Sequence, residues 1–328
     1  MAVLVTGGAG YIGSHTVAAL LEKGEDIVVV DNLQQGHRAA LLGGKLYAGD
    51  LRDAAFMDTV FQENSIDAVV HFAAHSLVGE SMKDPGKYYH NNVYGTLCLL
   101  QKMKEYNVLK LVFSSTAATY GEPENIPIRE EDRTSPTNTY GETKLAMEKM
   151  IRWFESACGL RSISLRYFNA AGAHESGKIG EHHEPETHLI PIVLETALGK
   201  RAHISIFGDD YNTPDGTCIR DYIHVSDLAD AHVLAVERLR SGAGSSVYNL
   251  GNGQGFSVKE VIDIARSVTG KEIAAKMEPR RAGDPAVLVA SSAKAREELG
   301  WSPSRSNLEE IIKSAWAWHS GHPNGYDN

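Results

Sequence analysis

The chain has 328 residues, of which 42% are hydrophobic and 23% are charged. These values are ordinary for a folded globular protein and exclude a coiled coil, a collagen-like fibre and a disordered tail. The length suits about two domains. The formal net charge of −10 argues against a nucleic-acid surface, which needs clustered Lys and Arg.

The sequence carries no sign of a membrane or secretory location. No stretch approaches the ~18 apolar residues of a membrane-spanning helix. The first residues, MAVLVTGGAG, lack the basic segment of a secretory signal. The three cysteines, Cys98, Cys158 and Cys218, have spacings that suit neither a disulfide framework nor a zinc site. We therefore expect a reducing, cytoplasmic compartment.

The first half of the chain repeats one pattern, an apolar β-branched run followed by a helical segment. The runs are AVLVT (2–6), IVVVD (27–31), AVVHFAA (68–74), KLVFSST (110–116) and SISLRYF (162–168). Continuous apolar runs are typical of strands that are covered on both faces. The sequence therefore predicts an α/β fold with a Rossmann-like, doubly wound parallel sheet.

The pattern changes after Asn169. Residues 170–188 are polar and irregular, whereas Ser257 to Gly270 has a capping box, an apolar helix face and a terminal glycine. A last helix follows from the apolar spacing between Leu308 and Trp316. We expect a cofactor domain over 1–169, completed by a segment near 221–240. A smaller mixed α/β substrate domain is expected over 170–328.

A glycine turn follows the first strand and opens the first helix. Gly7, Gly10 and Gly13 allow a tight turn and close approach of a pyrophosphate to the helix N-terminus. Asp31 ends the second strand, 18 residues after Gly13, where its carboxylate would bind the ribose hydroxyls of a dinucleotide. The same carboxylate repels the extra phosphate of NADP, so the pattern favours NAD. The alternative is a structural turn beside a solvated Asp.

Tyr140 and Lys144 stand four residues apart and so share one helix face. A free tyrosine has a pKa near ~10; a nearby ammonium favours its phenolate form, and a positive nicotinamide ring would add to this effect. Tyr140 would then be a general base. Alone, the pair also suits a packed Tyr beside a solvated Lys. The functional interpretation gains weight because Ser114 to Thr116 ends a strand, where ligands bind in doubly wound sheets.

The glycine spacing resembles that of the extended short-chain dehydrogenase/reductase superfamily. The segment Gly49-Asp50-Leu51-Arg52-Asp53 is similar to its adenine-contacting loop, and Thr116, Tyr140 and Lys144 match its catalytic set. Longer blocks resemble the UDP-hexose 4-epimerases: TGGAGYIGSH, HFAAHSLVGES, YYHNNVYGT, FSSTAATYGE, LRYFNAAGAH, FGDDYNTPDGTCIRDYIHV, YNLGNG and EPRRAGDP. The resemblance covers nearly the whole chain. It implies NAD-dependent, reversible inversion at C4 of UDP-galactose and UDP-glucose, in galactose metabolism, by a homodimer.

The resemblance also implies roles for individual residues. It assigns catalysis to Tyr140, Lys144 and Thr116. It assigns NAD binding to Gly7, Gly10, Tyr11, Ile12, Gly13, Asp31, Asn32, Asp50, Leu51, Phe72, Ala73, Ala74, Asn91, Ser114, Tyr140, Lys144 and Phe168. It assigns UDP-sugar binding to Thr116, Asn169, His188, Leu189, Ser205, Ile206, Phe207, Arg220, Arg281 and Asp284. For the two arginines, a surface salt bridge is the alternative.

Four positions depart from what is common in the family. Ser76 replaces a Lys of many bacterial members, His188 replaces an Asn that binds the substrate phosphates, and Thr116 replaces the commoner Ser. Val287 stands where a bulky Tyr can narrow the sugar pocket. The smaller valine leads us to expect that N-acetylated sugars, UDP-GlcNAc and UDP-GalNAc, are also accepted.

Three other functions fit parts of the sequence pattern. A nucleotide-sugar 4,6-dehydratase needs an acid and a base after the Ser/Thr, where this chain has Ala117 and Ala118. A UDP-glucuronate-processing enzyme and a non-catalytic NAD sensor are further alternatives, although a sensor has no need of the Tyr–Lys pair.

The histidines of the 170–188 segment raise the question of a metal. They are His174, His182, His183 and His188. Loop histidines are usually solvated, no carboxylate lies at metal-binding spacing on a regular element, and hydride chemistry on NAD needs no metal. We therefore expect none.

Overall fold

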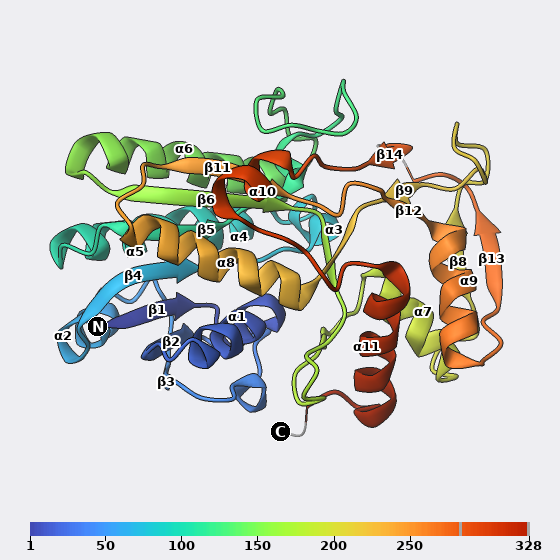
Figure 1. Cartoon of the computed structure of the whole chain (residues 1–328), viewed down its shortest axis with the longest axis horizontal. Coiled ribbons are helices and arrows are strands. Elements are labelled where there is room, and N and C mark those ends of the chain that lie inside the picture. Colours follow the sequence, from blue (N-terminus) through green and yellow to red (C-terminus); the bar gives the residue numbers. More distant parts are fainter. Residues whose placement is uncertain (282–283, 327–328) are drawn as a thin grey trace.

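A parallel sheet of seven strands organises the described part of the chain, residues 1–281 and 284–326 of a computed structural model (Figure 1). The strand order is β11-β6-β5-β4-β1-β2-β3. The strands are β1 (Ala2–Thr6), β2 (Ile27–Asp31), β3 (Lys45–Ala48), β4 (Ile66–His71), β5 (Lys110–Ser114), β6 (Arg161–Tyr167) and β11 (Ser246–Leu250). The order reverses at β1, which lies between β2 and β4, so the ligand crevice of such a sheet opens there.

Helices cover both faces of this sheet, which confirms the doubly wound fold. One layer holds α1 (Tyr11–Glu22), α8 (Val225–Arg240) and α10 (Ala293–Leu299). The opposite layer holds α2 (Ala54–Glu63), α5 (Gly95–Glu105) and α6 (Thr139–Cys158). Side chains alternate between the two cores along β1, Val3 and Val5 entering one and Leu4 the other. No helix among the described residues has the length and apolar character to cross a membrane.

Short elements connect the strand ends to these helices. They are η1 (Arg38–Ala40), α3 (Val78–Ser81), α4 (Pro85–Tyr88), the π-helical turn η2 (Tyr89–Tyr94) and η3 (Ala117–Thr119). The segment between η3 and α6 forms a long excursion above the sheet (Figure 1).

A smaller lobe packs beside the carboxyl ends of the strands (Figure 1). Its core lies between α7 (Leu189–Ala197), α9 (Val258–Thr269) and α11 (Leu308–Gly321). Its strands are β8 (Ile204–Phe207) with β13 (Ala275–Glu278), β9 (Ile219–Arg220) with β12 (Phe256–Ser257) and β14 (Val287–Leu288), and β7 (Asn169–Ala171) with β10 (Tyr222–His224). The two predicted C-terminal helices are confirmed as α9, with its capping box, and α11.

The chain passes between the two units more than once. Helix α8 packs on α1, and β11 then adds to the edge of the main sheet beside β6. The sequence predicted that a segment near 221–240 completes the first unit. Strand β11 also belongs to that unit and lies after this segment. A strand of five residues leaves little periodic signal, so the letters YNL did not predict it.

One buried carboxylate ties the C-terminal elements to α8. The Asp227 side chain accepts hydrogen bonds from the backbone N–H groups of Ser304 (3.2 Å) and Arg305 (2.8 Å) and from the Ser306 hydroxyl (2.8 Å). The Arg305 guanidinium donates to it as well, at 3.2 Å. Asp227 is 1% exposed, so these donors have little access to water as a replacement.

We expect Asp227→Ala to lower the free energy of unfolding by about 3 kcal/mol, since it leaves buried donors and a cation without their acceptor. Urea denaturation measures this loss. Asp230→Ala is the matched control, because Asp230 also pairs with Arg305 (3.0 Å) but its side chain is 51% exposed. The free energy of unfolding of Asp230→Ala should fall by less than about 1 kcal/mol. Equal losses in the two variants would contradict the assigned role of Asp227.

Candidate active site

The glycine turn between β1 and α1 leaves no room for side chains at two positions. Gly7 has a φ of 72°, and a Cβ added there would lie 2.6 Å from the backbone nitrogen of Ala73. A Cβ on Gly13 would lie 2.1 Å from the Gly7 carbonyl oxygen. Helix α1 begins after Gly10 with no side chain capping its N–H groups. This is the arrangement that receives a phosphate.

Asp31 lies beside this turn at the end of β2. Its carboxylate accepts hydrogen bonds from the backbone N–H groups of Ala9 (3.0 Å) and Leu33 (2.8 Å). Burial raises the pKa of Asp31, and the two N–H groups act in the opposite direction. An acid is therefore fixed at the position expected to bind the ribose.

The segment after β4 lies directly against the glycine turn. The backbone N–H groups of Phe72 and Ala73 both donate to the Thr6 carbonyl, at 2.9 and 3.1 Å. Phe72, Ala73 and Ala74 follow one another from this point and are partly buried. The structure thus brings the expected apolar cofactor contacts next to the expected phosphate contacts.

A second acid lies at the end of β3. Asp50 forms an ion pair with Arg52, which holds the pKa of Asp50 at about 2, and a hydrogen bond from the Asn32 side chain adds to this effect. Leu51, between them, is buried. The expected adenosine contacts Asn32, Asp50 and Leu51 therefore form one group.

Tyr140 and Lys144 extend from the first turns of α6 toward the end of β5. The Lys144 Nζ donates to the Ser114 carbonyl at 2.8 Å and lies 6.0 Å from the centre of the Tyr140 ring. Thr116 precedes η3, and its hydroxyl accepts from the Ala118 N–H at 3.2 Å. Asn138 caps the helix by accepting from the Gly141 N–H at 2.9 Å. The three expected catalytic residues come together at one strand end.

Burial controls the pKa values of the catalytic pair in the chain by itself. Burial raises the pKa of Tyr140 to about 12, while the Thr116 side chain lowers it slightly. Burial also lowers the pKa of Lys144 to about 7, against the attraction of Glu148. In the chain by itself, desolvation dominates the pKa values of both groups. The expected lowering of the Tyr140 pKa depends on Lys144 together with a positive nicotinamide ring, and it stays a prediction.

A buried network that sequence analysis missed supports this site. Glu148 accepts from Arg166 Nη2 (2.6 Å) and Nε (2.9 Å) and from the Ser115 hydroxyl (2.6 Å). Arg166 also donates to the Tyr120 hydroxyl at 2.9 Å. The available signal was the position of Glu148, four residues after Lys144 on the same helix face.

The remaining expected cofactor residues surround this centre. Asn91 lies in η2, where its side chain donates to Asn92 at 3.1 Å. Asn92, which was not predicted, is fully buried and donates to the His75 carbonyl (3.0 Å) and the Thr143 hydroxyl (3.1 Å). Phe168 follows β6 and is partly buried. Tyr11 donates to the Gly172 carbonyl at 2.6 Å.

The expected substrate residues lie in the smaller lobe and partly contact one another. Arg220 forms an ion pair with Asp284, and the Arg281 guanidinium lies 3.9 Å from the centre of the Phe207 ring. Asn169 donates to the Asp221 carbonyl at 2.9 Å. The other expected residues are His188 and Leu189 at the start of α7, and Ser205 and Ile206 in β8.

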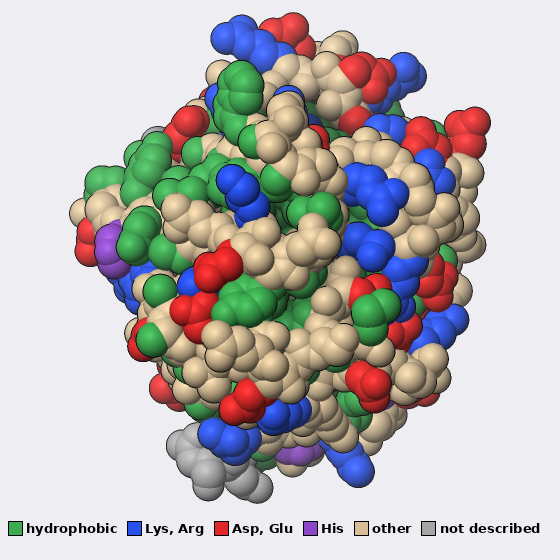
Figure 2. Space-filling model, turned by 90° about the vertical axis from the view of Figure 1, so that its left-hand side faces the viewer, with side chains coloured by type: hydrophobic (Ala, Val, Ile, Leu, Met, Phe, Trp, Pro, Cys, Tyr) green, Lys and Arg blue, Asp and Glu red, His purple; other side chains and the backbone are tan. Residues whose placement is uncertain are grey.

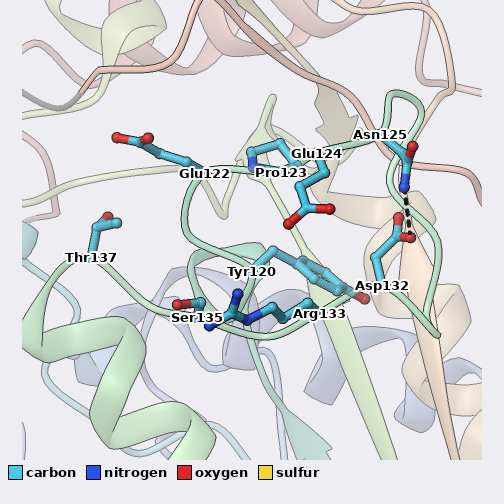
Figure 3. Close-up of a pocket in the computed structure, with 9 residues that line it drawn as sticks. All are labelled: Tyr120, Glu122, Pro123, Glu124, Asn125, Asp132, Arg133, Ser135 and Thr137. Carbon is cyan, nitrogen blue, oxygen red and sulfur yellow. Dashed lines mark hydrogen bonds between the residues drawn. The ribbon is translucent and has the colours of Figure 1, made fainter.

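A cavity of about 720 Å³ opens beside these residues. Its lining includes Arg281, Asp284 and Val287 from the smaller lobe, and Glu122 with Pro123 from the excursion between η3 and α6. Glu122 and Pro123 also line a second cavity of about 290 Å³ inside the excursion. Figure 3 shows this second cavity, with Tyr120 and Arg133 across from Glu122. The excursion thus forms a wall between the two cavities.

The histidine-rich segment does contain converging carboxylates. Despite the opposing effect of burial, Glu181 and Glu186 raise the pKa of His183 to about 9 and that of His188 to about 10. The sequence-based expectation concerned carboxylates on regular elements, and Glu181 and Glu186 lie outside them, between β7 and α7. The two acids come from an irregular loop, where sequence spacing does not reveal spatial distance.

Comparison with known proteins yields close relatives over the full length. The profile of the NAD dependent epimerase/dehydratase family matches residues 3–251. A UDP-glucose 4-epimerase of Halalkalibacterium halodurans is 63% identical over 99% of this chain and 98% of its own. A crystal structure of a UDP-glucose 4-epimerase is 60% identical with a TM-score of 0.98, covering 100% of both chains. The enzyme of Bifidobacterium longum, solved with NAD+ and UDP, is 44% identical with a TM-score of 0.94, covering 99% of this chain and 100% of its own.

We expect Gly13→Ala to destabilise the protein by about 2 kcal/mol or more, because the added methyl group meets a backbone carbonyl that has no rotamer to escape into. Gly10→Ala is the control, since its Cβ would lie 3.3 Å from its nearest neighbour, the Gly7 oxygen. Gly10→Ala should lower the free energy of unfolding by less than about 1 kcal/mol. Urea denaturation of both variants decides, and a Gly13→Ala protein as stable as the control would contradict the tight turn.

Proposed function

The chain belongs to the NAD dependent epimerase/dehydratase family, and on that premise we propose that it is an isomerase that interconverts UDP-glucose and UDP-galactose by inversion at C4. The observation that carries this proposal is the placement of Tyr140, Lys144 and Thr116 at one strand end, next to a glycine turn. Full-length identity to UDP-glucose 4-epimerases supports the same reaction.

The turn fits NAD. Gly7 and Gly13 exclude side chains from the place where a pyrophosphate would approach, and Asp31 suits the ribose hydroxyls. Bound NAD supplies a reversible hydride acceptor for the C4 carbon, so that the sugar is oxidised to a 4-keto form and reduced again. The net redox change is zero, and we therefore expect NAD to remain bound through turnover.

The proton is handled by the chain's own residues. We assign Tyr140 as the general base that accepts the C4 hydroxyl proton and later returns it. Thr116 would donate a hydrogen bond to the same oxygen. Since burial holds the pKa of Tyr140 at about 12, forming the phenolate requires positive charge nearby, and Lys144 is placed to provide part of it.

We assign the UDP end of the substrate to the smaller lobe. A diphosphate attracts guanidinium groups, and Arg220 and Arg281 are the candidates. For Arg220 this requires sharing or releasing its bond with Asp284, the residue proposed to bind the uridine ribose. Asn169, His188, Leu189, Ser205, Ile206 and Phe207 complete the proposed substrate set.

Two alternatives have less support. A 4,6-dehydratase would need an acid and a base after Thr116, where Ala117 and Ala118 form η3. A non-catalytic NAD sensor would not need a lysine whose burial lowers its pKa to about 7 beside a tyrosine. The shifted pKa values of Tyr140 and Lys144 favour a catalytic role for the pair.

We also propose a cytoplasmic homodimer. Trp153 on α6 is 75% exposed, and Tyr89 and Tyr94 in η2 are also exposed. Figure 2, which views the side at the left of Figure 1 where α5 and α6 reach the surface, shows hydrophobic side chains between charged ones. A second copy packed on this side would bury these exposed aromatic groups, and their exposure in the single chain supports the dimer. The unpaired thiols of Cys98, Cys158 and Cys218 support a reducing compartment.

The reaction is tested by incubating the purified protein with UDP-galactose without added NAD and following the anomeric NMR signals. We expect UDP-glucose to form. Tyr140→Phe should lower kcat by about 1,000-fold, in the range of a lost general acid–base group, while UDP binding changes little. Tyr106→Phe, whose phenol bonds to Asp58 and Gln62, is the matched control and should keep its kcat. A Tyr140→Phe enzyme of normal rate would refute the assigned base.

We further propose that UDP-GlcNAc and UDP-GalNAc are substrates, because Val287 presents a small side chain to the 720 Å³ cavity. UDP-GlcNAc should be converted above a buffer blank in the same NMR assay. Val287→Tyr should lower kcat/KM for UDP-GlcNAc about tenfold or more by filling the cavity, and leave UDP-galactose within about threefold. If the wild-type protein fails to convert UDP-GlcNAc, this part of the proposal is wrong.

A further inference from the structure

Four side chains with metal-binding atoms converge in the segment between β7 and α7. They are Glu181, His183, Glu186 and His188, and one ligating atom from each lies within 4.8 Å of all the others. Glu181 and Glu186 have side chains that are 5% exposed, whereas the imidazoles lie nearer the surface. We call this group the Glu–His cluster.

The spacing inside the Glu–His cluster matches a four-coordinate ion. Zinc with ligands at about 2.1 Å places neighbouring donor atoms of a tetrahedron about 3.4 Å apart. His188 Nδ1 lies 3.0 Å from an oxygen of Glu181 and 3.0 Å from one of Glu186. His183 Nδ1 lies 3.4 and 3.5 Å from oxygens of the same two residues. Each imidazole thus lies 3.0–3.5 Å from both carboxylates, close to the spacing around a shared ion, and without an ion His188 Nδ1 is hydrogen-bonded to Glu186.

One atom of the cluster has no satisfied hydrogen bond. His183 Nδ1 is buried and makes no bond of acceptable geometry, although two carboxylates lie within 3.5 Å of it. A buried polar atom without a partner needs a physical explanation. An ion held among the four groups would give this nitrogen a partner.

We propose that the Glu–His cluster is a binding site for a divalent transition ion of the zinc class. Two imidazole nitrogens and two carboxylate oxygens are ligands that zinc accepts, and two carboxylates balance its charge. Because His188 also belongs to the proposed substrate set, the ion would lie at the edge of the substrate site. The ion would fix the segment between β7 and α7, which lies between helix α1 and the smaller lobe.

The surroundings of the cluster suit a structural site. The Trp318 indole of α11 donates to the Glu181 carbonyl at 3.2 Å, and the Tyr11 ring of α1 packs edge-on to the His183 ring. The N–H groups of Thr187 and His188 donate to Glu186, each at 2.7 Å. These contacts orient the ligands from outside, as the outer shell of a metal site does. They also connect the loop to both units of the fold.

The test is metal binding by the untagged, full-length protein after chelator treatment and dialysis. Titration with Zn²⁺ in a calorimeter should show one ion per chain, and Co²⁺ in its place should give the intense visible absorption of a tetrahedral site. His183→Gln and Glu181→Gln should each weaken binding by about 100-fold or more, because even an outer-shell partner is worth about 10- to 100-fold.

His182→Gln is the matched control. His182 is the adjacent histidine, but it packs on His37 and Tyr326 outside the cluster, so this variant should bind zinc with unchanged affinity. Circular dichroism checks folding, and Glu186→Gln replaces His183→Gln if that variant does not fold. The proposal is overturned if the wild-type protein binds no ion, or if binding survives both ligand variants. It is equally overturned if His182→Gln loses the ion too. None of these results depends on epimerase activity.

Discussion

A buried ion pair between Glu148 and Arg166 fixes the catalytic helix to the sheet. Both side chains are almost completely buried, so each charge depends on the other, and an uncompensated one would cost about 3–5 kcal/mol. The Glu148 carboxylate also accepts from Ser115, which directly precedes Thr116. It is the group that opposes the loss of the Lys144 charge on burial. The position of the helix and the protonation of its lysine therefore depend on the same carboxylate.

Features whose partners lie close along the chain could be predicted from the sequence. The apolar runs identified strands β1, β2, β4, β5 and β6 because both faces of a parallel sheet are covered. The glycine spacing located the turn, since the steric demands of Gly7 and Gly13 are local. Tyr140 and Lys144 needed only the geometry of a helix. The fold class and the centre of the site followed from these patterns.

Features that join distant segments could not be predicted in this way. Glu148 lies on α6 and Arg166 on β6, 18 residues later, and Arg220 meets Asp284 across 64 residues of chain. The Glu–His cluster is closer in sequence, but an irregular loop has no period from which distances follow. The effect of burial on the pKa of Tyr140 belongs with these features, because burial is a property of the whole fold and not of neighbouring letters.

The position of β11 has a consequence for synthesis on the ribosome. Strand β6 is complete at Tyr167, but its neighbour at the sheet edge does not appear until residues 246–250. During translation of the intervening segment, the edge of β6 carries unpaired backbone groups, which are prone to pair with other chains. The edge of β6 is therefore covered only after residues 246–250 have emerged. The first unit cannot reach its final form as an independent N-terminal domain.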